Sequence, residues 1–187
     1  MCIRDRNWAN QVTYLRLLLI PVVIACFYSG LPNANLLAAL LFTVASFTDW
    51  LDGYLARRLN QTSDFGAFLD PVADKLLVVT VLIMLATTYS NLLLATAVII
   101  AREIIMSALR EWMAWQGQRD AVAVAFIGKL KTTVQMIAII LLLLATPYYL
   151  RWLWQLGLIL LYLATVLSVY SMLQYLKSAW PTLRRGA

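Results

Sequence analysis

Long apolar stretches alternate with short polar segments along nearly the whole chain. A helix that crosses the hydrocarbon layer of a membrane needs about 18 to 20 apolar residues, and several stretches approach or exceed that length. They cover residues 14–28, 36–56, 66–89, 92–115, 126–145 and 152–176. Clusters of turn-forming residues such as Gly30, Pro32 and Asn33 separate them. The pattern predicts an all-α, polytopic integral membrane helix bundle with six transmembrane helices.

Composition indicates that the bilayer is the solvent of this chain. Of 187 residues, 63% are hydrophobic and 13% are charged, and the mean hydropathy is +0.78. These values lie outside the range of soluble globular proteins. The chain has no His, which removes the commonest transition-metal ligand, and Cys2 and Cys26 lie far apart. We therefore expect neither a zinc site nor a disulfide framework.

The distribution of basic residues predicts an orientation. The net charge is +6, but basic residues that interrupt a hydrophobic chain are typical of cytoplasmic loops facing anionic lipids, so no nucleic-acid partner is expected. With the amino terminus in the cytoplasm, Arg151 alone flanks an opposite loop. The positive-inside rule then predicts a multi-pass protein with both termini on the cytoplasmic side.

The chain divides into one large unit and two short polar ends. Residues 1–9 form a polar amino-terminal extension, 10–177 a single transmembrane catalytic domain, and 178–187 a basic carboxyl-terminal tail. The opening MCIRDR matches neither the periodicity nor the composition of the rest of the chain, so a start-site artefact is one interpretation of it. Five tryptophans near predicted span ends are interpreted as interfacial anchors. They are Trp112, Trp115, Trp152, Trp154 and Trp180.

Four aspartates lie inside or at the edge of the second and third predicted helices. An ionised Asp at the centre of a spanning helix costs about 2.5 to 3.5 kcal/mol, so such a group needs a compensating partner. The residues are Asp49, Asp52, Asp70 and Asp74. The first two share a helix face at i, i+3 and the last two at i, i+4. Helix capping by interfacial charges would explain single aspartates, but not paired faces on adjacent antiparallel helices.

Oxygen-only ligands of this kind suit a hard divalent cation, Mg²⁺ or Mn²⁺, and four carboxylates can hold two ions. Gly53 and Ala56 continue the face of Asp49 and Asp52, and their small side chains let a bulky ligand approach the helix backbone. Arg57 adds a fixed positive charge beside them. A diphosphate would fit this setting.

The segment from Asp49 to Asp74 has the pattern D-x2-D-G-x2-A-R-x8-G-x3-D-x3-D, in which the second glycine is Gly66. This pattern resembles the signature of the CDP-alcohol phosphotransferase family. The segments AREIIMSALREWMA, from Ala101, and GKLKTT, from Gly128, resemble the bacterial members that use glycerol 3-phosphate as acceptor. The resemblance covers nearly the whole chain, and MCIRDR alone departs from it.

The resemblance implies the fold of that family, a bacterial cell (inner) membrane location with the active site on the cytoplasmic side, and a homodimer. It implies transfer of a phosphatidyl group from CDP-diacylglycerol to glycerol 3-phosphate, with CMP as leaving group. The aspartates that it assigns to two metal ions and the CDP diphosphate are Asp49, Asp52, Asp70 and Asp74. It assigns Asp74 as the base. Together with Asp52, the residues that we expect at the CDP-lipid are Gly53, Ala56, Arg57 and Gly66.

A phosphorylated acceptor also needs cations, and the fourth and fifth predicted helices carry Arg102, Arg110, Lys129 and Lys131. Arg110 is the first candidate, because its planar fork can grip a phosphate and Glu103, seven residues earlier, could orient it. Lys129 and Lys131 lie on different helix faces, so we expect only one to face the site. For Arg102, a phosphate contact and a buried ion pair that fastens helices together are equally good interpretations.

The sequence alone leaves several interpretations open. Thr13 and Arg16 fit an interfacial anchor as well as a contact with the CDP-lipid. The acceptor could instead be phosphatidylglycerol, giving cardiolipin, or an inositol phosphate, because the signature does not specify it. A metal-ion transporter would place polar residues through the whole membrane depth, whereas these carboxylates gather at one side. A noncatalytic scaffold would explain neither the carboxylates nor Gly53.

Overall fold

The computed structural model describes residues 8–59, 64–115 and 126–183, and side chains within 14–48, 72–115 (except Asp74) and 130–180. Every regular element in this part of the chain is a helix. The elements are α1 (Trp8–Tyr28), α2 (Ala34–Leu59), α3 (Asp64–Thr88), the 3₁₀-helix η1 (Ser90–Leu92), α4 (Leu93–Trp115), α5 (Phe126–Leu144) and α6 (Arg151–Leu183). The all-α prediction is therefore confirmed for the described residues.

The six predicted stretches correspond one to one with α1 to α6. The largest differences lie at the outer ends, where α1 begins at Trp8 instead of residue 14, and α6 continues to Leu183 instead of ending at residue 176. The prediction followed apolar runs, but helical hydrogen bonding continues through polar residues such as Lys177, which is itself a good helix former. Part of the segment predicted as a basic tail thus extends the last helix.

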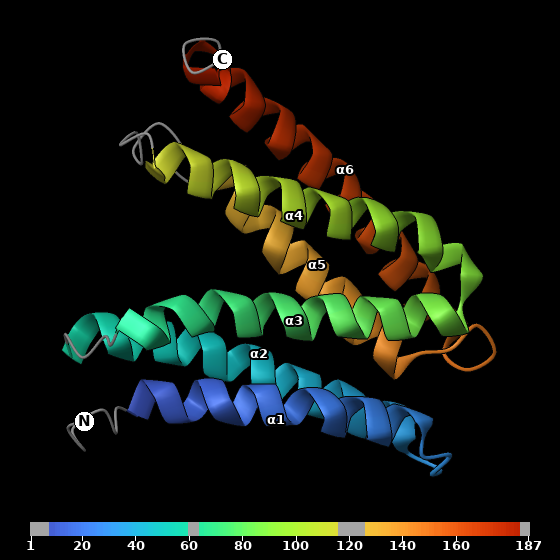
Figure 1. Ribbon diagram of the computed structural model, residues 1–187. Coiled ribbons are helices and arrows are strands. Elements are labelled where there is room, and N and C mark those ends of the chain that lie inside the picture. The colour runs from blue at the N-terminus through green and yellow to red at the C-terminus, as the bar shows by residue number, and fades with distance from the viewer. Residues whose placement is uncertain (1–7, 60–63, 116–125, 184–187) are drawn as a thin grey trace.

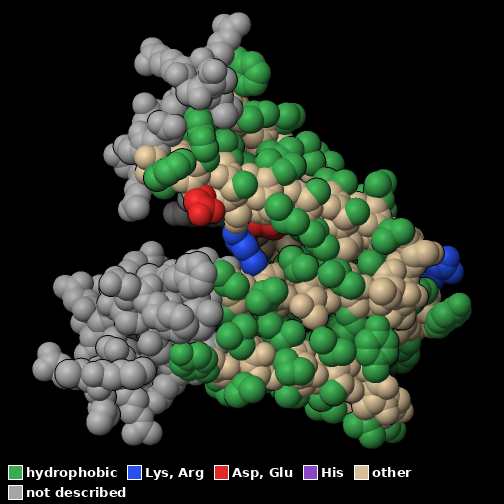
Figure 2. All heavy atoms as spheres, in the orientation of Figure 1, with side chains coloured by type: hydrophobic (Ala, Val, Ile, Leu, Met, Phe, Trp, Pro, Cys, Tyr) green, Lys and Arg blue, Asp and Glu red, His purple; other side chains and the backbone are tan. Residues whose placement is uncertain are grey.

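Two segments of the described chain are long and apolar enough to cross a membrane, Ser90–Trp115 and Arg151–Trp180. Four shorter apolar segments of 10–17 residues accompany them, Tyr14–Tyr28, Ala34–Thr48, Lys75–Thr88 and Leu130–Leu144. Many large apolar side chains point outward, and they cover much of the face in Figure 2. Such continuous apolar surface is typical of contact with lipid or with another protein. Membrane association is supported, and the count of six spans stays a prediction.

The helices form two groups, α1–α3 and α4–α6 (Figure 1). Within them, α1 packs against both α2 and α3, and α5 packs closely along α6. Gly157 on α6 makes this close packing possible, because a Cβ there would lie 3.0 Å from Cγ of Leu142 on α5. The groups meet near η1 and diverge toward the opposite end, on the left of Figure 1. At that end α2 and α4 finish, and α3 and α5 begin.

One tryptophan prediction is corrected by the packing. Trp154 is only 4% exposed, and its ring centroid lies 4.4 Å from that of Tyr89. It belongs to the hydrophobic core, because α6 turns this position inward against the end of α3. Trp115, Trp152 and Trp180 are exposed, as an interfacial anchor requires.

Candidate active site

The motif aspartates occupy matched positions on two consecutive helices. Asp49 lies ten residues before Leu59, where α2 ends, and Asp74 lies ten residues after Asp64, where α3 begins. With a rise of about 1.5 Å per residue, both backbones are about 15 Å from these helix ends. Because residues 60–63 join the two ends, both positions lie at about the same depth in the bundle.

Asp52 and Asp70 form a second matched level. They lie seven residues before the end of α2 and six residues after the start of α3, which corresponds to about 10 Å from the ends. The helical backbone therefore places Asp49 and Asp74 at one depth in the bundle. It places Asp52 and Asp70 at a second depth, closer to the helix ends. The side chains of these aspartates lie outside the described residues, as do those of the other motif positions. The latter are Gly53, Ala56, Arg57 and Gly66.

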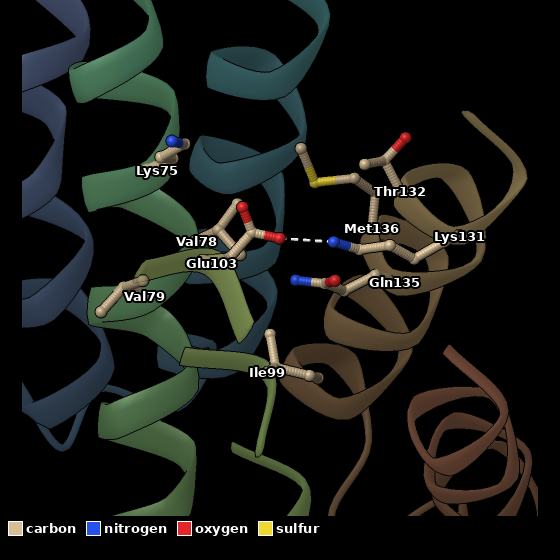
Figure 3. A pocket seen from close by; sticks show the side chains of 9 residues that line it. All are labelled: Lys75, Val78, Val79, Ile99, Glu103, Lys131, Thr132, Gln135 and Met136. Carbon is tan, nitrogen blue, oxygen red and sulfur yellow. Dashed lines mark hydrogen bonds and ion pairs between the residues drawn. The ribbon is translucent and has the colours of Figure 1, made fainter. Parts of the chain in front are cut away.

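A pocket lies between α3, α4 and α5, and its lining includes Lys75, the residue that follows the last motif aspartate in the sequence. Its lining consists of Lys75, Val78, Val79, Ile99, Glu103, Lys131, Thr132, Gln135 and Met136 (Figure 3). The volume of about 80 Å³ leaves room for several waters or one small polar ligand. Figure 2 shows a hollow between the two helix groups, with basic and acidic side chains at its inner end.

Glu103 is the centre of an ion-pair network beside this pocket. Its Oε1 accepts hydrogen bonds from Nη1 of Arg102, at 2.8 Å, and from Nζ of Lys131. Lys131 is only 1% exposed, so its charge is compensated mainly by Glu103. Removing one partner of such a pair is costly, because it leaves an uncompensated buried charge. The network therefore fixes Lys131 at the pocket wall.

Arg102 connects this network to α6. Its Nε donates to the Ser168 carbonyl oxygen at 3.4 Å, and its Nη2 donates to Oγ of Ser171 at 3.0 Å. The sequence suggested that Arg102 belongs to a buried ion pair that fastens helices together. Its contacts with Glu103 and with α6 agree with that interpretation, and they join α4 to α6. A contact between Arg102 and the acceptor phosphate stays a prediction.

The pocket has an excess of positive charge. Lys75 on α3 donates to Oγ of Ser107 on α4, and it lines the same pocket as Lys131. Among the described lining side chains, Lys75 and Lys131 are cations and Glu103 is the carboxylate, whereas Arg102 pairs with Glu103 from outside the lining. The described lining thus carries one more positive charge than negative charge. A low-dielectric cleft with such an imbalance attracts anions.

Arg110, the first candidate for the acceptor phosphate, has different surroundings from Arg102 and Lys131. Arg110 is exposed, and its Cζ lies 5.6 Å from the ring centroid of Tyr175 on α6. The hypothesis that Glu103 orients Arg110 is not supported, because the described contacts of Glu103 go to Arg102 and Lys131. Residues seven apart are about 10 Å apart along a helix, which explains why nearer cations are its partners.

Among the lysines of α5, Lys131 is the one that the structure places at the pocket, and the side chain of Lys129 lies outside the described residues. Thr13 lies outside them as well. Arg16 is 2% exposed, which does not fit an anchor that reaches the headgroups from the protein surface. Its contact with the CDP-lipid stays a prediction.

Sequence reasoning missed Lys75 and Gln135 as lining residues. Lys75 directly follows Asp74, and Gln135 interrupts the apolar face of α5 four residues after Lys131. The sequence did indicate both residues as candidates, since a polar side chain inside an apolar helix is a functional candidate by default. The sequence does not reveal that residues of α3, α4 and α5 meet in one pocket.

The model of the family described as CDP-alcohol phosphatidyltransferase matches residues 6–170. The chain belongs to this family. A relative from Salmonella choleraesuis (strain SC-B67) is 48% identical over 175 residues, which are 92% of this chain and 94% of the relative. A relative from Escherichia coli (strain K12) is 49% identical over the same shares. Both are named "CDP-diacylglycerol--glycerol-3-phosphate 3-phosphatidyltransferase".

The CDP-alcohol phosphatidyltransferase match confirms the resemblance inferred from the motif. It includes the motif from Asp49 to Asp74 as well as the pocket residues of α3, α4 and α5. The ion-pair network and the pocket are therefore features of the family domain in this chain, and not of a segment added to it.

Proposed function

We propose that this chain transfers the phosphatidyl group of CDP-diacylglycerol to glycerol 3-phosphate, giving phosphatidylglycerol phosphate and CMP. The names of relatives that are 48–49% identical over 92% of the chain support this activity. In the structure, the proposal rests on one observation, the pocket with excess positive charge whose lining includes Lys75, the residue that follows Asp74. A phosphorylated alcohol bound there would lie beside the proposed reaction centre.

Lys131 and Lys75 would bind the acceptor phosphate. An ammonium group has three N–H donors, so Lys131 can keep its contact with Glu103 and still donate to a phosphate oxygen. Lys75 supplies a second cation from the opposite wall of the pocket, on α3. Binding between two helices would orient the acceptor with its primary hydroxyl toward Asp74, which saves the entropy of bringing the reactants together.

The donor set of the motif fits two Mg²⁺ or Mn²⁺ ions, because it consists of carboxylates at matched depths on α2 and α3. The residues that would hold these ions are Asp49, Asp52, Asp70 and Asp74. When bound, the ions would neutralise charge on the diphosphate and lower the pKa of a nearby hydroxyl. Because a carboxylate is a weak base, Asp74 then only needs to steer a loosened proton.

The proposed step is a displacement at the lipid-linked phosphorus. Asp74 accepts the proton of the acceptor hydroxyl, and the hydroxyl oxygen forms a bond to phosphorus while the bond to the CMP oxygen breaks. The small residues Gly53, Ala56 and Gly66 leave space for the CDP group at the helix backbone. Arg57 would attract its diphosphate.

For location, we propose six spans in the bacterial cell (inner) membrane, with both termini and the site on the cytoplasmic side. The distribution of basic residues supports this orientation. In Figure 1 the terminal ends of α1 and α6 lie at the same end of the bundle as the helix ends nearest the motif. Assembly as a homodimer stays a prediction from the resemblance.

An acceptor comparison tests the proposed activity. We expect the purified protein with CDP-diacylglycerol and Mg²⁺ to release CMP when glycerol 3-phosphate is added, and to form phosphatidylglycerol phosphate. Phosphatidylglycerol and inositol phosphate should each give less than about a tenth of that rate, since a change in a hydrogen-bonded group costs at least tenfold in such a site. Preferential use of either of these two acceptors would reject the proposal.

Replacing Lys131 tests the acceptor contact. We expect Lys131→Met to raise the KM for glycerol 3-phosphate by roughly 10- to 100-fold, because a charge-assisted hydrogen bond contributes about 1.5 to 3 kcal/mol. The KM for CDP-diacylglycerol should change much less. Lys177→Met removes the same charge from an exposed position on α6 and serves as the matched control. Equal effects of the two substitutions would exclude a specific contact at Lys131.

A further inference from the structure

We infer that Gln135 selects the acceptor by binding the hydroxyl group on its middle carbon, an inference that depends on the proposed function. Gln135 is 5% exposed, and its Oε1 has no hydrogen-bond partner within the described part of the chain. A buried polar atom without a partner is costly, so native structures usually supply one. Here the amide faces a pocket that can receive a ligand.

The position of Gln135 defines the inner end of this pocket. Helices α3 and α5 run inward from the end that carries the motif, whereas α4 runs outward toward it. Gln135 therefore lies one turn deeper than Lys131, and Val78 one turn deeper than Asp74. Ile99 lies one turn deeper than Glu103. Figure 3 shows the amide of Gln135 pointing into the pocket, close to the contact between Lys131 and Glu103.

Apart from Gln135, the inner end of the pocket is apolar. Its other lining side chains are Val78, Val79, Ile99 and Met136. A ligand hydroxyl that faced these groups would lose its hydrogen bonds to water without replacement. Among the described lining residues, the inner end thus offers a bound ligand one polar partner, the amide of Gln135.

Glycerol 3-phosphate matches this arrangement. Its phosphate is at one end, the attacking hydroxyl is at the other, and a second hydroxyl is on the middle carbon. With the phosphate bound by Lys131 and Lys75 and the attacking hydroxyl toward Asp74, the middle carbon would lie over the inner end. Since a hydroxyl group both donates and accepts, either end of the Gln135 amide can bind it.

The same arrangement disfavours larger polyols. A cyclic polyol phosphate carries several hydroxyl groups, and a pocket of about 80 Å³ with one amide at its inner end cannot pair them all. Unpaired hydroxyls facing Val78 and Ile99 would reduce binding steeply, because each is desolvated without compensation. Gln135 would therefore favour a three-carbon acceptor with a single middle hydroxyl.

The test compares glycerol 3-phosphate with 3-hydroxypropyl phosphate, which lacks only the middle hydroxyl. For the unaltered protein we expect kcat/KM to be at least about tenfold higher with glycerol 3-phosphate, as for a site that hydrogen-bonds a substrate hydroxyl. Gln135→Met keeps the side-chain length and removes the amide, so the ratio of the two kcat/KM values should fall toward one. Gln155→Met, which makes the same chemical change at an exposed position on α6 outside the pocket, should leave the ratio unchanged.

The outcomes separate the two proposals. Absence of activity with glycerol 3-phosphate in the unaltered protein would reject the proposed function itself. Equal use of both acceptors by the unaltered protein would overturn the role of Gln135, even if Gln135→Met did not fold. An unchanged ratio in Gln135→Met, or an equal loss with both acceptors, would also overturn it. Gln135→Asn, which keeps the amide but shortens it, should retain part of the preference.

Discussion

Removal of divalent cations with EDTA is expected to reduce CMP release by the purified protein to background, a loss of at least about 10³-fold. The reason is the carboxylate set on α2 and α3. Without cations, the negative charges of four aspartates and a diphosphate would repel one another at close range. Adding Mg²⁺ or Mn²⁺ in excess should restore the rate. The measurement is CMP formed per minute with CDP-diacylglycerol and glycerol 3-phosphate.

EDTA already saturated with Mg²⁺ is the control, because it keeps the chelator but removes no ions. It should leave the rate unchanged. Full CMP release in metal-free buffer would be incompatible with the proposed metal site, whatever the acceptor. Restoration by Zn²⁺ in preference to Mg²⁺ would also contradict a hard-cation site, which the oxygen ligands and the absence of His favour.

Asp74→Asn should lower kcat by roughly 10²- to 10⁴-fold, the range that a general base contributes. The substitution preserves side-chain size but removes the negative charge, so Asp74 could neither accept the hydroxyl proton nor hold a cation strongly. Turnover with saturating glycerol 3-phosphate is the measurement. A titration with Mn²⁺ separates the two roles, because excess metal should compensate for a weakened ligand but not for a missing base.

Asp64→Asn provides the matched comparison for this substitution. It makes the same chemical change on the same helix, at the first residue of α3, which is one of the unspecified positions of the motif. We expect nearly normal turnover from it. If Asp74→Asn kept near-normal turnover at saturating metal, Asp74 would not be the base. Full recovery at high Mn²⁺ would leave Asp74 only as a metal ligand.

Much of the fold could be predicted from the sequence because helix formation in an apolar chain depends mainly on local features. Uninterrupted apolar runs and the turn at Gly30 to Asn33 set the helices within a few residues. The ends were less predictable, since α6 continues through Lys177 to Leu183. Hydrogen bonding along a helix does not stop where the apolar pattern stops.

The candidate site was predictable only in part. Sequence spacing assigned the aspartates to helix faces, and a cation at Lys131 was among the acceptor candidates. The partners of Glu103 were not predictable, because choosing Lys131 over Arg110 requires the relative placement of α4 and α5. Burial of Trp154 against Tyr89 was missed for the same reason, since a tryptophan near a helix end can face either lipid or the core.

By itself, the sequence determined the helices, the paired aspartates and the resemblance to a family, since these depend on neighbours a few residues apart. Only the tertiary structure decided which distant side chains share a pocket. Lys75, Glu103 and Gln135 come from three helices, and no local pattern specifies how those helices pack. The physical reason is that local periodicity fixes the face of a helix, whereas the orientation of that face depends on contacts made with the rest of the chain.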